Sequence, residues 1–102
     1  MLQPTLNWKR GPVDERDFIS KRQVTAPTEL PDEFQLPVDI PVYDQQNLGS
    51  CVSNSTCACY RFEAWQLHNT FGFEPSRLFL YYNTREIEGT IYEDSGAYIR
   101  DA

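Results

Sequence analysis

Residues 50–68, SCVSNSTCACYRFEAWQLH, decide the fold. They contain no glycine or proline that would interrupt a long helix. Apolar side chains recur along them at near-helical spacing, which favours one helix from Cys51 to about His68, buried on most of its sides. The positions in this stripe are Val52, Cys59, Phe62 and Trp65, widened by Ala58, Tyr60, Ala64 and Leu67. Ser50 is a good N-cap, because its hydroxyl can accept a backbone N–H from the first turn, and residues 69–72 end the helix.

Cys51 is a candidate nucleophile because of where it lies on this helix. A cysteine on an apolar helix usually acts as a small hydrophobic residue, and that interpretation suits Cys57 and Cys59. The first turn, however, offers unpaired N–H groups and the positive end of the helix dipole, which stabilise a thiolate. A thiolate that attacks a carbonyl also needs donors for the oxyanion. Gln45, six residues before Cys51, and Gln46 are both candidates, and the spacing alone does not choose between them.

Residues 42–51, VYDQQNLGSC, carry a family resemblance. They resemble the papain-like (C1) cysteine peptidases, and most closely a non-secreted branch of bacteria and viruses whose signature reads roughly VYDQGNLGSC. In that family a glutamine six residues before the nucleophile supplies the oxyanion donor. The resemblance therefore implies that Cys51 is the nucleophile and Gln45 the oxyanion-hole residue, while Gln46 replaces a usual glycine.

Other blocks resemble the same branch in the same order along the chain. Asn7-Trp8 and residues 14–18 look like its leader, and residues 30–36 are similar to its LPxxFDLR stretch. Residues 75–85 look like its second helix. The resemblance implies an α+β papain-like fold, of which this chain covers the mainly helical N-terminal lobe.

The local signals define the parts of that lobe. Six of the seven prolines lie in the first 41 residues, which predicts an extended, irregular leader over residues 1–36 and a short edge strand over residues 38–43. The lobe then spans residues 37–102. Its second helix is expected from an N-cap at Ser76 to about Glu88, stopped by Gly89, and a third helix should start near Ser95.

The cysteines depart from the secreted papains, which carry a disulfide cysteine where this chain has Leu48 and an aromatic residue where it has Val52. The three cysteines present, Cys51, Cys57 and Cys59, lie on one predicted helix, where two of them cannot reach disulfide geometry. We therefore expect free thiols in a reducing compartment.

The general base of a thiol peptidase is not found near Cys51. Such an enzyme needs a histidine within hydrogen-bond reach and an orienting Asn or Asp behind it. The single histidine, His68, lies about 25 Å along the same helix. In papain-like enzymes the histidine and asparagine follow the cysteine by about 130 to 150 residues, beyond Ala102. We therefore expect an N-terminal fragment that lacks its β-rich lobe, needs that lobe and is inactive alone.

Two functions other than proteolysis are considered for this sequence. A non-catalytic papain-like interaction module without a second lobe is the alternative to a peptidase. A metal site from Cys51, Cys57, Cys59 and His68 is disfavoured, because Cys57 and Cys59 would point about 200° apart on a helix. No metal or organic cofactor is expected.

The composition limits the classes of molecule that the protein is expected to bind. The net charge of the 102 residues is −6 and no basic patch is present, which argues against nucleic acid. No segment resembles a signal peptide or a membrane span, so a cytoplasmic location is favoured over secretion. The expected partner is a peptide or protein substrate, and its sequence preference, like the choice between endo- and exopeptidase, stays open.

Overall fold

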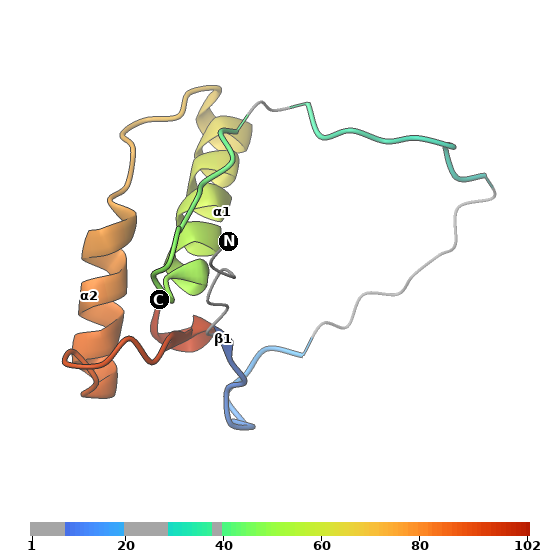
Figure 1. The fold of residues 1–102 in the computed structure, drawn as a ribbon. Helices are drawn as coiled ribbons and strands as arrows, with labels where there is room; N and C mark the ends of the chain where they lie inside the picture. The colour runs from blue at the N-terminus through green and yellow to red at the C-terminus, as the bar shows by residue number, and fades with distance from the viewer. Residues whose placement is uncertain (1–7, 20–28, 38–39) are drawn as a thin grey trace.

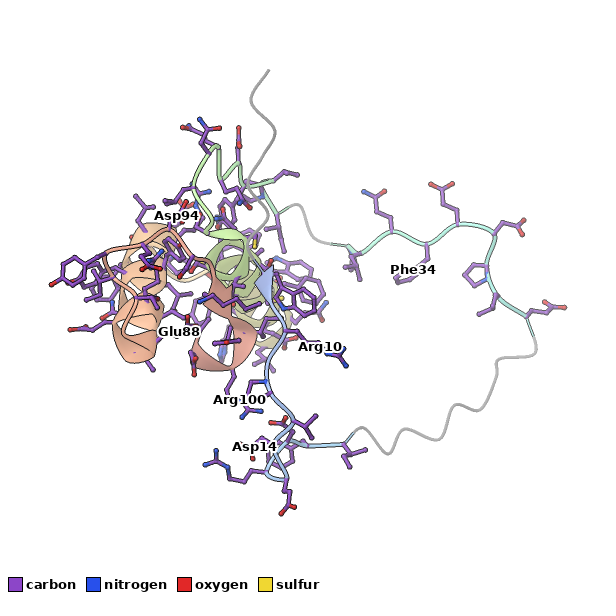
Figure 2. The ribbon with its side chains drawn as sticks, turned by 60° about the horizontal axis from the view of Figure 1, so that its bottom comes forward. Arg10, Asp14, Phe34, Glu88, Asp94 and Arg100 are labelled. Atoms are coloured by element: carbon purple, nitrogen blue, oxygen red, sulfur yellow. The ribbon has the colours of Figure 1, made fainter. Side chains whose placement is uncertain are left out.

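The computed structural model describes residues 8–19, 29–37 and 40–102. Within them the order of elements is β1 (Trp8–Lys9), α1 (Cys51–His68), α2 (Arg77–Glu88), β2 (Ala97–Tyr98) and a 3₁₀ helix, η1 (Ile99–Asp101). Figure 1 shows α1 and α2 standing side by side, with the chain before Cys51 running along α1. Residues 29–37 lie well away from the helices, and Phe34 there is 76% exposed (Figure 2).

The helix α1 has the predicted bounds, but it begins without the predicted cap. Ser50 makes no side-chain capping bond to the first turn, because its backbone (φ −98°, ψ 24°) lacks the extended conformation that aims an N-cap hydroxyl at that turn. Its Oγ instead accepts a hydrogen bond from Asn54 Nδ2 at 3.1 Å. At the other end Asn69 adopts a left-handed conformation and donates its N–H to the Trp65 carbonyl.

The expectation that α1 is buried on most sides is wrong. Its buried residues are Val52, Ser53, Asn54 and Cys57, all in the first half of the helix. Cys59 is exposed, and Leu67 is 73% exposed. The buried apolar cluster, formed by Val52, Tyr81 and Ala97 with Leu48, Cys51 and Ala102 against it, lies at the N-terminal end of α1. In the second half of the apolar stripe Tyr60 and Leu67 are exposed, while Phe62, Ala64 and Trp65 are only partly buried.

The helix α2 confirms the local signals that predicted it. Ser76 is extended and its Oγ accepts the Phe79 N–H at 3.2 Å, as an N-cap should. Gly89 ends the helix in a left-handed conformation (φ 70°), and its N–H bonds back to the Arg85 and Glu86 carbonyls. Glycine adopts this conformation without the steric penalty that a Cβ atom would add.

The prediction of a third α-helix near Ser95 is wrong. Gly96 has φ 76°, and the next two residues form β2, which pairs in parallel with β1 in the register Trp8 to Ala97 and Lys9 to Tyr98. Only the three-residue 3₁₀ helix η1 follows. Pairing with a distant strand has overridden the local helix signal.

Glu88, the last residue of α2, fastens this small sheet. Its side chain is only 4% exposed, and its carboxylate pairs with Lys9 Nζ at 3.1 Å. The same carboxylate accepts the Tyr98 N–H at 2.7 Å. The buried charge is therefore satisfied from both strands, and the leader is tied to the end of α2.

The predicted edge strand over residues 38–43 is only partly testable. Residues 38–39 lie outside the described residues, and residues 40–43 run on without forming a strand. In the described part of the leader, β1 is the one strand and no helix is present. Neither α1 nor α2, the two α-helices of the described residues, has the length and apolar character that a membrane span requires.

Candidate active site

Cys51 is the first residue of α1 and its side chain is partly exposed. It lies between two hollows in the surface. The first, called here the Cys51 hollow, is lined by Cys51, Gln45, Ser55, Ala58 and the chain from Ile40 to Tyr43. The second is more apolar and is lined by Cys51, Val52, Cys59, Trp8 and Ile99. Cys51 therefore lines both hollows.

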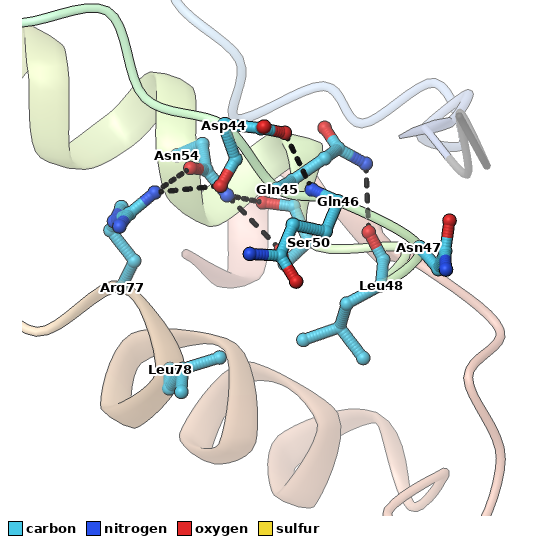
Figure 3. Close-up of a pocket in the computed structure, with 9 residues that line it drawn as sticks. All are labelled: Asp44, Gln45, Gln46, Asn47, Leu48, Ser50, Asn54, Arg77 and Leu78. Carbon is cyan, nitrogen blue, oxygen red and sulfur yellow. Dashed lines mark hydrogen bonds between the residues drawn. The ribbon is translucent and has the colours of Figure 1, made fainter. Parts of the chain in front are cut away.

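The loop of residues 44–50, which leads into α1, is held by a tight turn (Figure 3). The Leu48 N–H bonds back to the Gln45 carbonyl at 3.2 Å, and Gln46 has a left-handed backbone with φ 53°. Asp44 supports the turn, since its Oδ1 accepts the Gln46 N–H at 2.8 Å. This conformation gives a physical reason for a glycine at position 46 in the signature that the chain resembles.

The side chain of Gln45 is held close to the helix start. Its Nε2 donates to the Leu48 carbonyl at 2.8 Å (Figure 3). Gln45 also lines the Cys51 hollow, whereas Gln46 is exposed and does not line it. Of the two glutamines, Gln45 is therefore the one that shares the Cys51 hollow with Cys51.

A second set of bonds ties the loop to α2. Asn54 Nδ2 donates to the Ser50 carbonyl at 2.7 Å, while its Oδ1 accepts a bond of 2.7 Å from Arg77 Nη1. The Arg77 guanidinium also reaches the Asp44 carbonyl and lies 4.4 Å from the centre of the Tyr43 ring. Sequence reasoning missed Asn54 and Arg77. The available signal was a polar residue on the buried side of an otherwise apolar helix.

On the other side of the loop, the Asp94 carboxylate accepts a hydrogen bond from the backbone N–H of Gly49. The Gly49 N–H lies 3.0 Å from each oxygen of the Asp94 carboxylate. The Tyr81 hydroxyl donates to Asp94 Oδ1 at 2.5 Å. Burial, and then this bond to a carboxylate, raise the pKa of Tyr81 above its ordinary value. Asp94 and Tyr81 were also missed in the sequence.

No protein-family profile matches the chain. It is 49% identical over 65 residues to a peptidase C1-like protein of Acanthamoeba polyphaga mimivirus, an alignment that covers 64% of this chain and 21% of the viral protein. Its structure matches xylellain, a cysteine protease from Xylella fastidiosa, with a TM-score of 0.80 and 40% identity over 94% of this chain. The chain is similar to part of the papain-like cysteine peptidases, both in sequence and in fold.

The papain-like chain spans about a fifth of the viral relative and about a third of xylellain, 21% and 36% of their lengths. Its two helices and short sheet correspond to the mainly helical N-terminal lobe of the papain-like fold. The two relatives come from a virus and a bacterium, the two sources of the branch that the sequence resembles.

The remaining thiols of this papain-like lobe differ from Cys51. Cys57 is 1% exposed, and burial raises the pKa of its thiol, which agrees with a structural role. Cys59 is exposed, which its interpretation as a packed hydrophobic residue did not anticipate. His68 is exposed at the opposite end of α1 from Cys51. Over the described ranges, no three His, Cys, Asp or Glu side chains gather closely enough to hold a metal ion.

Proposed function

We propose that this chain forms the thiol-bearing half of the active site of a cysteine peptidase, in which Cys51 attacks the carbonyl carbon of a peptide bond. The observation that carries the proposal is the position of Cys51, partly exposed at the first residue of an 18-residue helix and in one hollow with Gln45. The proposed lobe is residues 37–102, and the leader is residues 1–36.

The helix start supports the first chemical step. Cys51 is the first residue of α1, beside the backbone N–H groups of the first turn, which can donate to a negative charge that develops there. The sulfur bonds to the carbonyl carbon while the carbonyl electron pair moves onto oxygen. When the resulting intermediate collapses, the C–N bond breaks, the amine leaves with a proton from the general acid, and a thioester remains on Cys51. Water then hydrolyses the thioester.

Gln45 is the proposed oxyanion donor, together with the backbone N–H of Cys51. Donors act best when they are fixed in place before charge develops. The bond from Gln45 Nε2 to the Leu48 carbonyl supports this role, because it anchors the amide beside the Cys51 hollow. The amide nitrogen carries two N–H groups, so its bond to Leu48 is compatible with donation to an oxyanion.

The general base is proposed to come from a β-rich second lobe, because His68 lies about 25 Å from Cys51 along α1. Uncovered apolar side chains on both helices support such a partner. They include Leu67 (73% exposed), Phe79 (72%) and Ile87 (70%). The 102 residues alone are therefore proposed to supply the thiol and the oxyanion donors but not to turn over substrate.

The test compares two thiols of the same helix in the full-length protein. Cys51→Ala should reduce turnover of a fluorogenic peptide pool to background, whereas Cys59→Ala should leave it unchanged, because Cys59 is exposed eight residues further on. At pH 6, iodoacetamide should label Cys51 before Cys59, as mass spectrometry of the peptides would show. Turnover that survives in Cys51→Ala would refute the proposal, and equal labelling of both thiols would favour the interaction module.

A further inference from the structure

The loop before Cys51 is anchored by a residue that lies 45 positions later in the chain. The Asp94 carboxylate places both of its oxygens 3.0 Å from the Gly49 amide nitrogen. Gly49 is buried, so its N–H would be left without a partner if that acceptor were removed. In sequence the contact lies two residues from Cys51, whereas the side-chain bond from Arg77 reaches Asn54, three residues from Cys51.

Asp94 is itself held from α2. The Tyr81 hydroxyl donates to Asp94 Oδ1, and Arg85 Nη1 donates to that hydroxyl at 2.7 Å. Arg85 Nη1 also lies 3.7 Å from Asp94 Oδ1, and Arg85 Nη2 donates to the Thr90 carbonyl. Tyr81 and Arg85 are 5% and 4% exposed. A buried pair of α2 side chains therefore fixes the carboxylate that receives Gly49 (Figure 2 labels Asp94 beside the helices).

The geometry of Gly49 is transmitted to the thiol over a short path. The Ser50 N–H bonds to the Leu48 carbonyl at 2.8 Å, which closes a three-residue turn centred on Gly49. The next residue, Cys51, is already helical. A displacement of Gly49 would therefore move the Cys51 thiol relative to Gln45, on the other side of the turn. A misplacement of about 1 Å in a reacting group can reduce a rate by about 10²-fold.

We infer that Asp94 is a positioning residue, which fixes the Gly49 turn and so holds Cys51 and Gln45 in register for attack and oxyanion stabilisation. The inference rests on the proposed function. Position 48, where the secreted papains carry a disulfide cysteine, is Leu48 here. The adjacent amide is held instead by hydrogen bonds to Asp94, with no covalent link.

Three substitutions in the full-length protein separate this role from a general structural one. Asp94→Ala removes the acceptor for Gly49 and also the ion-pair partner of Arg85. Asp94→Asn removes the same charge but keeps one oxygen at the same distance along the side chain. Glu93→Gln is the matched control, because Glu93 is exposed and its described bond comes from the backbone N–H to Thr90.

We expect kcat to be highest in the wild type and Glu93→Gln, lower in Asp94→Asn and lowest in Asp94→Ala. In Asp94→Ala the loss of kcat should be about 10- to 100-fold, with little change in KM. Hydrogen exchange of the Gly49 amide should accelerate in the same order. If Asp94→Asn matched Asp94→Ala in both measurements, the effect would come from the unpaired Arg85 charge, and the inference would be overturned. Wild-type kcat and exchange in Asp94→Ala would overturn it as well.

Two further conditions keep the test decisive. Urea titrations establish that each variant is folded where it is assayed, and if Asp94→Ala does not fold, wild-type exchange and kcat in Asp94→Asn overturn the inference. If the wild-type protein cleaves no peptide, the proposed function fails separately. Gly49 exchange and the rate of iodoacetamide labelling of Cys51 then decide whether Asp94 positions the loop, with slower labelling and faster exchange in Asp94→Ala supporting it.

Discussion

The guanidinium of Arg100 lies 2.7 Å from the carboxylate of Asp14, a residue 86 positions earlier in the chain. The same guanidinium bonds to Asp17 at 2.6 Å, so one arginine near the end of the lobe holds two aspartates of the leader (Figure 2 labels Arg100 and Asp14). Asp14 also forms an ion pair with Arg16, which belongs to the same turn. These bonds hold the leader segment that follows β1 against the lobe.

Arg100→Gln should loosen this segment without unfolding the lobe. Ion pairs at the surface are individually weak, so we expect amide hydrogen exchange over residues 8–18 to accelerate by roughly two- to tenfold while exchange in α1 and α2 stays constant. Arg10→Gln is the control, because Arg10 belongs to the same segment but points away from the helices (Figure 2). Equal exchange in both variants would contradict a role for Arg100.

Acid should release the same segment. Hydrogen bonds from Arg16, followed by the charge of Arg100, hold the pKa of Asp14 well below its ordinary value. Arg16 belongs to the same turn as Asp14, so only the part of this lowering that comes from Arg100 depends on docking. That part stabilises docking at pH values above the ordinary pKa and is lost as the pH falls toward the lowered value. Exchange over residues 8–18, corrected for its intrinsic pH dependence, should therefore rise below about pH 4. In Arg100→Gln this rise should be smaller.

Gln46→Gly should stabilise the protein. Gln46 has φ 53°, a conformation that costs a residue with a Cβ atom roughly 1 kcal/mol and costs glycine almost nothing. Urea titration should show a gain in the free energy of unfolding of up to about 1 kcal/mol, reduced by the greater freedom of glycine in the unfolded chain. Asn47→Gly is the control, since Asn47 does not have a positive φ, and it should be neutral or destabilising. A loss of stability in Gln46→Gly would contradict the prediction.

Val52→Ala should destabilise the lobe, because Val52 is 4% exposed in the apolar cluster with Tyr81 and Ala97. Removing two buried methyl groups costs about 1.5 kcal/mol in lost burial, and more if a cavity remains. Val42→Ala is the same substitution at a residue that is 99% exposed, and it should change the free energy of unfolding by less than about 0.5 kcal/mol. Similar urea midpoints for the two variants would show that the cluster is not the core of the lobe.

The sequence predicts those elements whose signals are local. Both α-helices follow from a run without breakers, and α2 also from an N-cap at Ser76 and a glycine at position 89. The strand β2 could not be predicted in this way, because its formation depends on Trp8 and Lys9, which lie far back in the chain. The burial of α1 was overestimated, since an apolar stripe records which face can be covered but not which part of the chain covers it.

In the candidate site, too, residues with local signals were found from the sequence, and residues that depend on distant contacts were not. The position at a helix start made Cys51 a candidate, spacing left both Gln45 and Gln46 open, and the family resemblance selected Gln45. The roles of Cys51 and Gln45 stay proposals. The supporting roles of Asn54 and Asp94 were not predicted. Asn54 bonds to Arg77, 23 positions away, and Asp94 bonds to Gly49, 45 positions away. A polar side chain in a sequence does not reveal which distant group it meets, so the support around the thiol could be found only in three dimensions.

The pairing of β1 with β2 also sets the order in which the chain can assemble during synthesis. Trp8 leaves the ribosome first, yet its partner Ala97 is made roughly 4 to 18 s later at typical elongation rates. During that interval α1 and α2 can already pack through contacts that are close in sequence. Of the described elements, β1 can therefore pair only after both α-helices have been synthesised, and Trp8 and Lys9 stay without their strand partners until then.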